Sequence, residues 1–495
     1  MKNGYFTRTP SLIGLCRNAG ALCLLALIGV GLVSCKSMVA GGPEAMPGRI
    51  LADSPALTSR APNMPIGTAM GVKPGRVVWV HDPDAVNWDG ETGLWYDSSN
   101  FDQRAVDRMM SQAICALAGK KSAAAAWKAL FRHFNQTHGR GSVGYKRGEK
   151  IMIKLNLSGL HMLSVPESQR WEQAVNTTPA MTMSLLKQLI EVAGVAPPDI
   201  TVGDTGSYFS PMYFDQIHAA WPQVNCLAFK SYDGRVGATP SDHPVFWSTP
   251  AAAGKAQDYA PKQYAEATYL INFAQLKAHN AGGVTLCGKN HYGSLIRMPE
   301  DETPDGKPYF NLHSTLVSRP YGPPGYGQYR VQVDFMGHAD FGGKTLLYLL
   351  DGLFGYWDAA WEPKQGYKTN KWHSPPFNDN WPCSLLASQD PVAIDSVGYD
   401  IWWEEAPYQP GHYARLPGAD DYLHEAALAD NPPSGTFYDP NHAAPTTRMQ
   451  SQGVHEHCNN PVERTYSRNL GSGNGIELVT IGVDQTDRRE ANPAR

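Results

Sequence analysis

The chain has 495 residues, of which 42% are hydrophobic and 18% are charged, and its formal net charge is −4. This composition is ordinary for a globular protein with a large apolar core. A mildly acidic chain without a stripe of lysines and arginines exerts no long-range attraction on nucleic acid, so we expect no nucleic-acid partner.

The chain begins with the features of a bacterial lipoprotein signal peptide. Residues 1–34 contain three basic residues, no acidic one, and an apolar run over 19–33 that is short for a membrane span. The run ends in LVSC at 32–35, which resembles a lipobox. This resemblance implies cleavage before Cys35, acylation of that cysteine, and a body that is anchored to a membrane of the cell envelope outside the cytoplasm. The alternative is a plain secretory signal in which the cysteine stands by chance.

The rest of the chain divides by composition. Residues 36–72 are rich in Gly, Pro, Ala and Ser and have no apolar period, which predicts a flexible stalk after the Cys35 anchor. We expect one α/β domain over 73–404 and an extension over 405–495 that wraps the core. The cysteines of the body are widely spaced and form no CxxC motif, so we expect neither a disulfide framework nor an iron–sulfur cluster in this chain.

Short apolar runs alternate with helical stretches along the body. Ser122 and Thr178 stand at cap positions of two predicted helices, and Asp390-Pro391 starts a third. The alternation predicts an α/β fold, with a mainly parallel sheet and helices on both of its faces. The strands are predicted at 76–80, 150–157, 199–202, 268–273, 345–350, 384–387 and 476–483, and the helices at 103–118, 122–134, 178–194 and 390–403.

Polar residues stand where these strands end. In open α/β sheets ligands bind beyond the carboxyl ends of the strands, so we expect the polar residues to share one site. Lys154 and Asn156 lie on one face of a strand, and a lysine in an apolar strand needs water or a partner. For Asp390, which precedes a proline, a helix cap is the interpretation we favour over a place in this site. The other members of this set are Asp204, Lys277, His279 and Asp351.

The segment 277–293, KAHNAGGVTLCGKNHYG, is the densest in polar residues. It holds two lysines and two histidines around the glycines Gly282 and Gly283. Glycines before a helix expose backbone N–H groups, and the helix dipole adds positive potential, which suits a phosphate, carboxylate or sulfate. The GxxxxGK pattern in this segment differs from a P-loop, because Asn290 stands where Ser or Thr would bind magnesium and the preceding strand ends at Phe273, about ten residues too early.

Two further segments are candidates for binding. His455 and His457 face one way if the chain is extended there, a spacing that can chelate a divalent metal; the alternative is a pair of polar loop residues that pack locally. Between Gly355 and Trp381 lie seven aromatic residues among Gly, Pro and Lys. Such residues stack on sugar rings when exposed, or pin down a long loop when buried, and burial is the interpretation we favour.

These motifs also carry a family resemblance. The strand IMIKLNL at 151–157, TP at 178–179, VGDTG at 202–206, the LIN…LKAH…GGVT…GKNHYG block, LLDGLFG at 349–355 and ASQDPVAIDSVG at 387–398 resemble, in this order, the domain of unknown function 362 family. The resemblance covers residues 148–403 and implies an α/β fold but no settled reaction. Some relatives carry an appended ferredoxin-like cysteine cluster, which this sequence lacks. The segments DYLHEAALADNPPSGTFYDPN and GVHEHCNN are similar to an extension of longer exported members. The recurrent polar positions of the family correspond to Lys154, Asn156, Asp204, Lys277, His279, Lys289, Asn290, Asp351, Asp390 and Asp395.

Two kinds of function fit these patterns. In the first, the protein is an enzyme that acts on an anionic small molecule or glycan. Its lysines clamp the anion, His279 or His291 is the acid or base, and Asp204 and Asp351 orient a histidine or hold a divalent cation. In the second, it is a non-catalytic envelope protein that binds glycan, metal or another protein. The charged strand ends favour the enzyme, because a pure binder seldom needs so many buried titratable groups. The substrate-binding residues expected are Lys154, Asn156, Lys277, Gly282, Gly283, Lys289, Asn290, Asp390 and Asp395.

Overall fold

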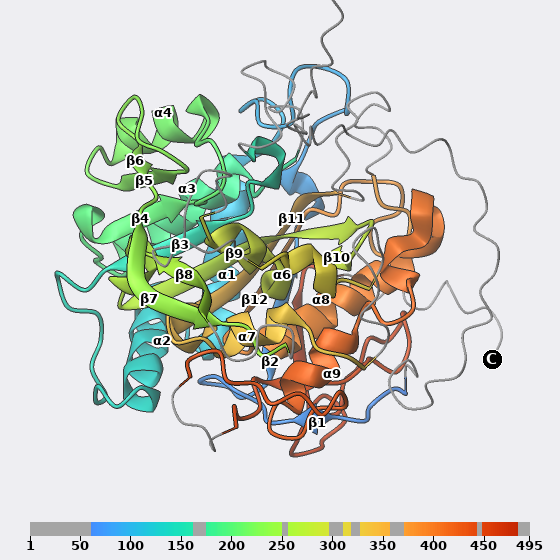
Figure 1. The fold of residues 1–495 in the computed structure, drawn as a ribbon. Coiled ribbons are helices and arrows are strands. Elements are labelled where there is room, and N and C mark those ends of the chain that lie inside the picture. Colours follow the sequence, from blue (N-terminus) through green and yellow to red (C-terminus); the bar gives the residue numbers. More distant parts are fainter. Residues whose placement is uncertain are drawn as a thin grey trace, which may run out of the picture. The chain divides into compact units, whose positions relative to one another are not determined.

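The computed structural model describes residues 61–161, 175–249, 256–296, 310–317, 327–356, 371–442 and 448–483 (Figure 1). Its centre is a ten-stranded sheet in the order β14-β2-β12-β11-β9-β3-β4-β5-β6, with β10 paired to β9. The strands are β2 (Arg76–His81), β3 (Ile151–Leu155), β4 (Ile200–Gly203), β5 (Asn225–Ala228), β6 (Val236–Gly237), β9 (Tyr269–His279), β10 (Gly283–Thr285), β11 (Thr345–Tyr356), β12 (Ser384–Ser388) and β14 (Glu477–Ile481).

The strands on this path run parallel with the exception of β12. Strand β12 pairs antiparallel with both of its neighbours, β11 and β2, whereas the remaining pairs on the path are parallel. The carboxyl ends of the parallel strands therefore lie along one edge of the sheet, the carboxyl edge, and β12 ends at the opposite, amino edge. The prediction of an α/β fold with a mainly parallel sheet is confirmed.

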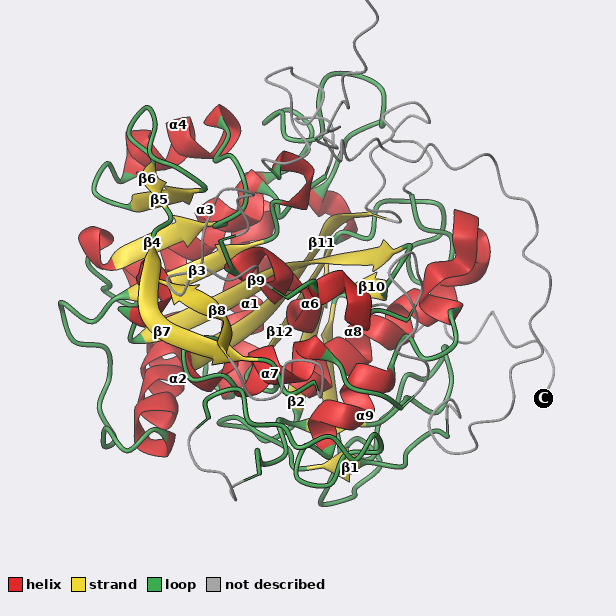
Figure 2. Cartoon of the chain, in the orientation of Figure 1, coloured by secondary structure: helices red, strands yellow, loops and turns green. Residues whose placement is uncertain are grey.

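Helices cover both faces of the sheet (Figure 2). Successive residues of β2 alternate between two apolar cores: Val78 and Val80 pack with α1 to α4, while Val77 and Trp79 pack with α5 to α9. Fully buried strands of this kind carry apolar residues on both faces. The helices are α1 (Gln103–Ala118), α2 (Ala123–Thr137), α3 (Pro179–Lys187), α4 (Pro211–Ala220), α5 (Lys262–Ala265), α6 (Cys287–Asn290), α7 (Val331–Gly337), α8 (Pro391–Glu405) and α9 (Asp421–Ala427).

Side-chain caps fix where several helices begin. Ser122 Oγ accepts a hydrogen bond from Ala125 N at the start of α2, and Thr178 Oγ1 accepts one from Met181 N at the start of α3. Asp390 caps α8 by accepting from two backbone N–H groups of its first turn. Each cap satisfies N–H groups that have no partner within the helix. The predicted cap residues of these helices are therefore confirmed.

Residues 61–72, which the composition assigned to the stalk, belong to the folded body. Strand β1 (Ile66–Gly67) pairs antiparallel with β13 (Val454–His455) of the carboxy-terminal part of the chain. Met70 N and Val72 N donate hydrogen bonds to Asp390 and Gln389, respectively, which immediately precede α8. The glycine- and proline-rich composition reflected turns packed on the body rather than a free linker. Residues 1–60, including the predicted signal peptide and Cys35, lie outside the described residues.

The described part of the loop-rich carboxy-terminal region supplies α9, β13 and β14 to this body. Helix α9 packs against α7 and α8, and β14 extends the sheet as the parallel neighbour of β2. A separate hairpin is formed by β7 (Pro240–Phe246) and β8 (Ala256–Pro261). No helix in the described part of the chain is both long enough and apolar enough to cross a membrane.

Candidate functional site

A buried ion pair lies at the carboxyl edge, where β3 and β4 end. Lys154 Nζ is 2.7 Å from Asp204 Oδ2, and both side chains are at most 4% exposed. The same ammonium donates to Leu155 O at 2.5 Å and to Asn290 Oδ1 at 3.1 Å. An ammonium has three hydrogens, and all three are used within the protein. Lys154 therefore holds the strand ends and α6 together, and it is not available to clamp a substrate as the sequence suggested.

A directional chain of hydrogen bonds leads from this ion pair to His291. Asn290 Nδ2 donates to Asn272 Oδ1 at 2.8 Å, and Asn272 Nδ2 donates to His291 Nε2 at 3.0 Å. Since Nε2 accepts, the neutral ring carries its proton on Nδ1, which faces Ser294 Oγ at 3.1 Å. Burial and the charge of Lys154 lower the pKa of His291 to about 3. Both nitrogens of the neutral ring are thus hydrogen-bonded within the protein, and the acid–base role suggested by the sequence stays a prediction.

Lys277 points toward the loop that follows β3. Its Nζ lies 2.6 Å from Ser158 Oγ, and Ser158 Oγ in turn donates to Asn156 Oδ1 at 3.0 Å. Lys277 is 2% exposed, so this lysine is buried at the end of β9. Two residues earlier on the same face of β9, the amide of Gln275 is buried with neither its oxygen nor its nitrogen hydrogen-bonded to a described residue.

Lys289 and His279 stand beside Lys277. Lys289 is 9% exposed and lies over the ring of Tyr292, 4.7 Å from its centre, and no carboxylate of a described residue pairs with it. Burial and the charge of Lys277 lower the pKa of Lys289 to about 7. Burial, followed by the charges of Lys289, His313 and Lys277, holds the pKa of His279 well below its usual value. These side chains form a cationic cluster at the carboxyl edge, defined here as Lys277, His279 and Lys289.

The glycine turn and the start of α6 are occupied by the protein's own side chains. His279 Nδ1 accepts hydrogen bonds from Ala281 N and Gly282 N, so the turn closes on the histidine instead of opening toward an anion. The carboxylate of Asp395 accepts from Cys287 N and Gly288 N at the start of α6. The sequence suggested an external anion at this helix end, but Asp395 takes that position from α8. Gly283 has φ +78°, and a Cβ there would come 2.4 Å from Ala419 Cβ.

Asp351 and Asp390 lie outside the cationic cluster. Asp351 accepts from Thr178 N and Leu353 N and so fixes the start of α3 beside β11; burial raises its pKa to about 6. Asp390 follows β12, whose reversed direction places it at the amino edge, where it accepts from Val392, Ala393, Met70 and Val454 N–H groups. The expectation that Asp390 binds substrate is therefore wrong. Its alternative, a helix cap, is what the structure has.

The two histidines near the carboxy terminus belong to a second polar cluster on α8 and α9. His455 Nδ1 lies 2.8 Å from Ser396 Oγ, and His457 Nδ1 lies 2.7 Å from Asp400 Oδ1. Asp420 and His424, which the sequence analysis did not single out, lie within reach of His455. The signal was present in the sequence: an aspartate and a histidine four residues apart share one face of a helix.

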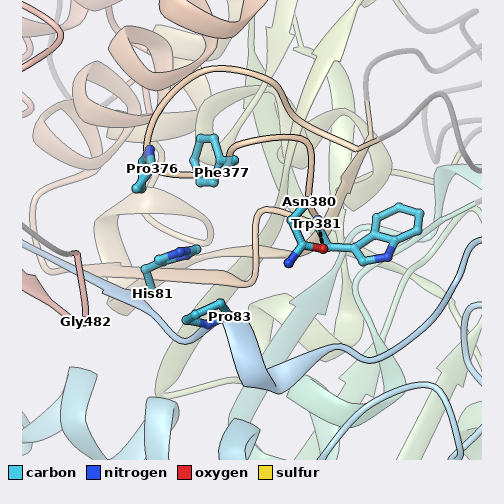
Figure 3. Close-up of a pocket in the computed structure, with 7 residues that line it drawn as sticks. All are labelled: His81, Pro83, Pro376, Phe377, Asn380, Trp381 and Gly482. Atoms are coloured by element: carbon cyan, nitrogen blue, oxygen red, sulfur yellow. Dashed lines mark hydrogen bonds between the residues drawn. The ribbon is translucent and has the colours of Figure 1, made fainter. Parts of the chain in front are cut away.

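A pocket lies farther along the carboxyl edge, at the ends of β2 and β14 (Figure 3). It is lined by His81, Pro83, Pro376, Phe377, Asn380, Trp381 and Gly482. None of these described lining residues is a lysine or a carboxylate, and none belongs to the cationic cluster. Trp381 is 1% exposed and stacks on Trp88 at 5.2 Å. Phe377 and Trp372 are likewise buried, so these aromatic residues of the segment 371–381 pin the chain down; residues 357–370 of the predicted aromatic loop lie outside the described ones.

The fold and the site define an α/β protein with a mainly parallel sheet, a buried ion pair and a cationic cluster at its carboxyl edge. The chain belongs to the DUF362 family, a domain of unknown function, whose model matches residues 151–400. Those residues contain the ion pair, the hydrogen-bond chain to His291 and the cationic cluster. No curated protein and no solved structure matches the chain.

Proposed function

We propose that the protein is an enzyme that binds an anionic small molecule or glycan at the cationic cluster and transfers a proton there. The observation that carries the proposal is the position of Lys289, a buried lysine next to Lys277 and His279 with no carboxylate of a described residue to neutralise it. Burying like charges together lowers stability unless a ligand compensates. A phosphate or carboxylate group of the substrate would supply that compensation.

The two neighbouring groups suit different steps of proton transfer. Lys289, with its pKa near 7, exchanges a proton at neutral pH and is the candidate general acid or base. His279 accepts two backbone hydrogen bonds at Nδ1, so its neutral ring carries the proton on Nε2. That N–H is a donor for an oxygen on which negative charge develops. Asp204 and Asp351 are not needed as acids or bases in this scheme, because both are held by internal hydrogen bonds.

The alternative of a glycan-binding protein without catalytic activity has less support. Sugar stacking needs an exposed aromatic face. Among the described residues of the aromatic segment, Trp372, Phe377 and Trp381 are all buried. The chemistry at the carboxyl edge is cationic instead, which favours an anionic ligand.

Inorganic phosphate and citrate are the first probes. Their binding is measured as a change in the melting temperature of the full-length chain at pH 6.5. We expect both anions to raise the melting temperature of the wild type. Lys289→Met should weaken binding by roughly ten- to a hundredfold, the effect of one lost charge-assisted hydrogen bond of about 1.5–3 kcal/mol. Lys230→Met is the matched control, since Lys230 is an exposed lysine that also lies over an aromatic ring, that of Phe229. Equal responses of the wild type and Lys289→Met would contradict the proposal.

We also propose that the protein is a lipoprotein of the cell envelope, tethered through Cys35 to a bacterial membrane. The support is the order of basic, apolar and LVSC segments at the start of the sequence. Cys35→Ala should move the protein from the detergent phase to the aqueous phase on phase separation, because two or more acyl chains give stable anchoring. A variant that stays with the detergent like the wild type would remove the tether from the proposal.

A further inference from the structure

Three side chains on α9 and β13 bring metal-binding atoms together. Asp420, His424 and His455 each offer one atom, and these atoms lie within 4.8 Å of one another. Asp420 precedes α9 and His424 follows four residues later, so the helix places them on one face. His455 comes from β13, and its ring centre lies 4.4 Å from that of His424. Ligands around one zinc ion at about 2.1 Å lie roughly 3.4 Å apart, so a small closure completes the geometry.

In both histidines of this group, Nδ1 already has a contact within the protein. Nδ1 of His455 is engaged by Ser396 Oγ, and Nδ1 of His424 lies 3.4 Å from Asp420 O, which leaves Nε2 of each ring. A second hydrogen bond at the far nitrogen is the usual support of a metal-binding histidine. Asp420 stands at the cap position of α9 yet makes no cap hydrogen bond, unlike Asp390 at α8. Its carboxylate is directed to the histidines instead.

A buried histidine, His457, lies within ion-pair distance of the Asp420 carboxylate. His457 Nδ1 contacts Asp400 Oδ1 at 2.7 Å, and His457 Nε2 lies 3.4 Å from Asp420 Oδ2. Asp400 is fixed in turn by Cys458 N at 2.8 Å and Tyr466 Oη at 3.0 Å. Asp400 of α8 thus contacts His457, and His457 contacts Asp420. Contacts of this kind behind a ligand orient it toward the metal.

We propose that Asp420, His424 and His455 bind one divalent transition-metal ion, with His457 and Asp400 as positioning residues. Two imidazole nitrogens and one carboxylate oxygen favour zinc or a similar ion over calcium and magnesium, which prefer oxygen. This differs from the site expected from sequence, because His457 faces carboxylates and Asp420 and His424 take its place. Three protein ligands leave coordination positions for water or a substrate. Asp420 follows Ala419, which packs on Gly283 of the hairpin that carries His279.

The test is a titration of the full-length chain, freed of metal with a chelator, with Zn²⁺ alone in a calorimeter. We expect one Zn²⁺ per chain, and we expect Asp420→Asn, His424→Ala and His455→Ala to lose this binding while their metal-free melting temperatures stay close to that of the wild type. His373→Ala is the matched control, because His373 also contacts an aspartate, Asp379, but is exposed and outside the cluster. Lys289→Met should bind Zn²⁺ as the wild type does, which separates this site from the anion site.

The visible absorption spectrum of the Co²⁺-loaded protein provides a second readout. It does not depend on the variants of the three ligand residues. Two imidazoles and a carboxylate at a site with few ligands should give intense visible absorption bands, and His457→Gln should shift them while reducing metal affinity by roughly 10- to 100-fold. A wild type that binds no Zn²⁺, or that gives only the weak spectrum of hydrated Co²⁺, overturns the proposal. So does Zn²⁺ binding that is unchanged in all three ligand variants.

Discussion

Lys154 Nζ and Asp204 Oδ2 lie 2.7 Å apart beneath Gly293, where a Cβ would come 2.8 Å from the same Asp204 oxygen. The two residues end neighbouring parallel strands and are 50 positions apart in the sequence. No side chain larger than hydrogen fits above the pair without displacing it. The backbone of the segment that carries Asn290 and His291 thus covers the pair. This coverage accounts for the low exposure of both charged side chains.

The first prediction concerns this ion pair. Lys154→Met leaves a buried carboxylate without its partner and should lower the free energy of unfolding by about 3–5 kcal/mol. The double variant Lys154→Met/Asp204→Leu should recover a large part of that loss, because neither charge then remains. Urea denaturation of both proteins measures the difference. A single variant as stable as the wild type would mean that water reaches the site.

The second prediction uses the pKa of Lys289. Its folded-state pKa of about 7 lies below the unfolded value near 10.5, so the unfolded chain binds more protons between these values. The free energy of unfolding therefore rises with pH through that window, by up to about 1.4 kcal/mol per pH unit, because the penalty of burying the charged lysine is progressively removed. Lys289→Met should be more stable than the wild type below pH 7, and the advantage should shrink toward pH 10. A constant difference between the two proteins from pH 6 to pH 10 would contradict the assigned pKa.

The third prediction compares Gly282 and Gly283, two neighbouring glycines where the chain turns from β9 into β10. Gly283→Ala forces an alanine into φ +78° and brings its Cβ 2.4 Å from Ala419 Cβ, so it should destabilise the protein by about 1–3 kcal/mol or more. The Cβ of Gly282→Ala would meet Lys289 Cδ and Val284 O at 3.3 Å and Lys289 Cε at 3.4 Å, so this substitution should cost less. Melting temperatures of the two variants decide. Equal losses would show that the hairpin does not rest on Ala419 in solution.

The fourth prediction separates a buried cap from an exposed one. Asp390 accepts from four backbone N–H groups, two of them outside α8, so Asp390→Ala should cost about 2 kcal/mol or more. Asp102→Ala removes the exposed cap of α1, which accepts from Arg104 N, and should cost about 0.5–1 kcal/mol. Neither variant should change phosphate binding at the cationic cluster. A loss of phosphate binding in Asp390→Ala at temperatures where it remains folded would restore Asp390 to the ligand site.

Local patterns in the sequence predicted the fold because apolar alternation and helix caps are local. They placed Lys154 and Asp204 in a larger set of polar residues expected to share one site, since parallel strands end at one edge, but they did not single out the ion pair that these two residues form. They failed for Asp390, because nothing in the local sequence of β12 encodes that it runs antiparallel. They failed for Asp395 because the carboxylate that fills the start of α6 comes from 107 residues away. His424 was missed for another reason: the spacing was visible, but its meeting with His455 depends on tertiary packing.

Helix α8 is buried from Pro391 through Trp402, on every side and not on one stripe. Part of its covering comes from α9 and β13, besides that from β12, β11 and α6, and β14 pairs with the free side of β2, so residues beyond 404 contribute to the same body. A chain ending at residue 404 would expose the apolar side of α8 together with an unpaired strand, a surface prone to self-association. We therefore expect a fragment that ends at residue 404 to be less soluble than the full-length chain.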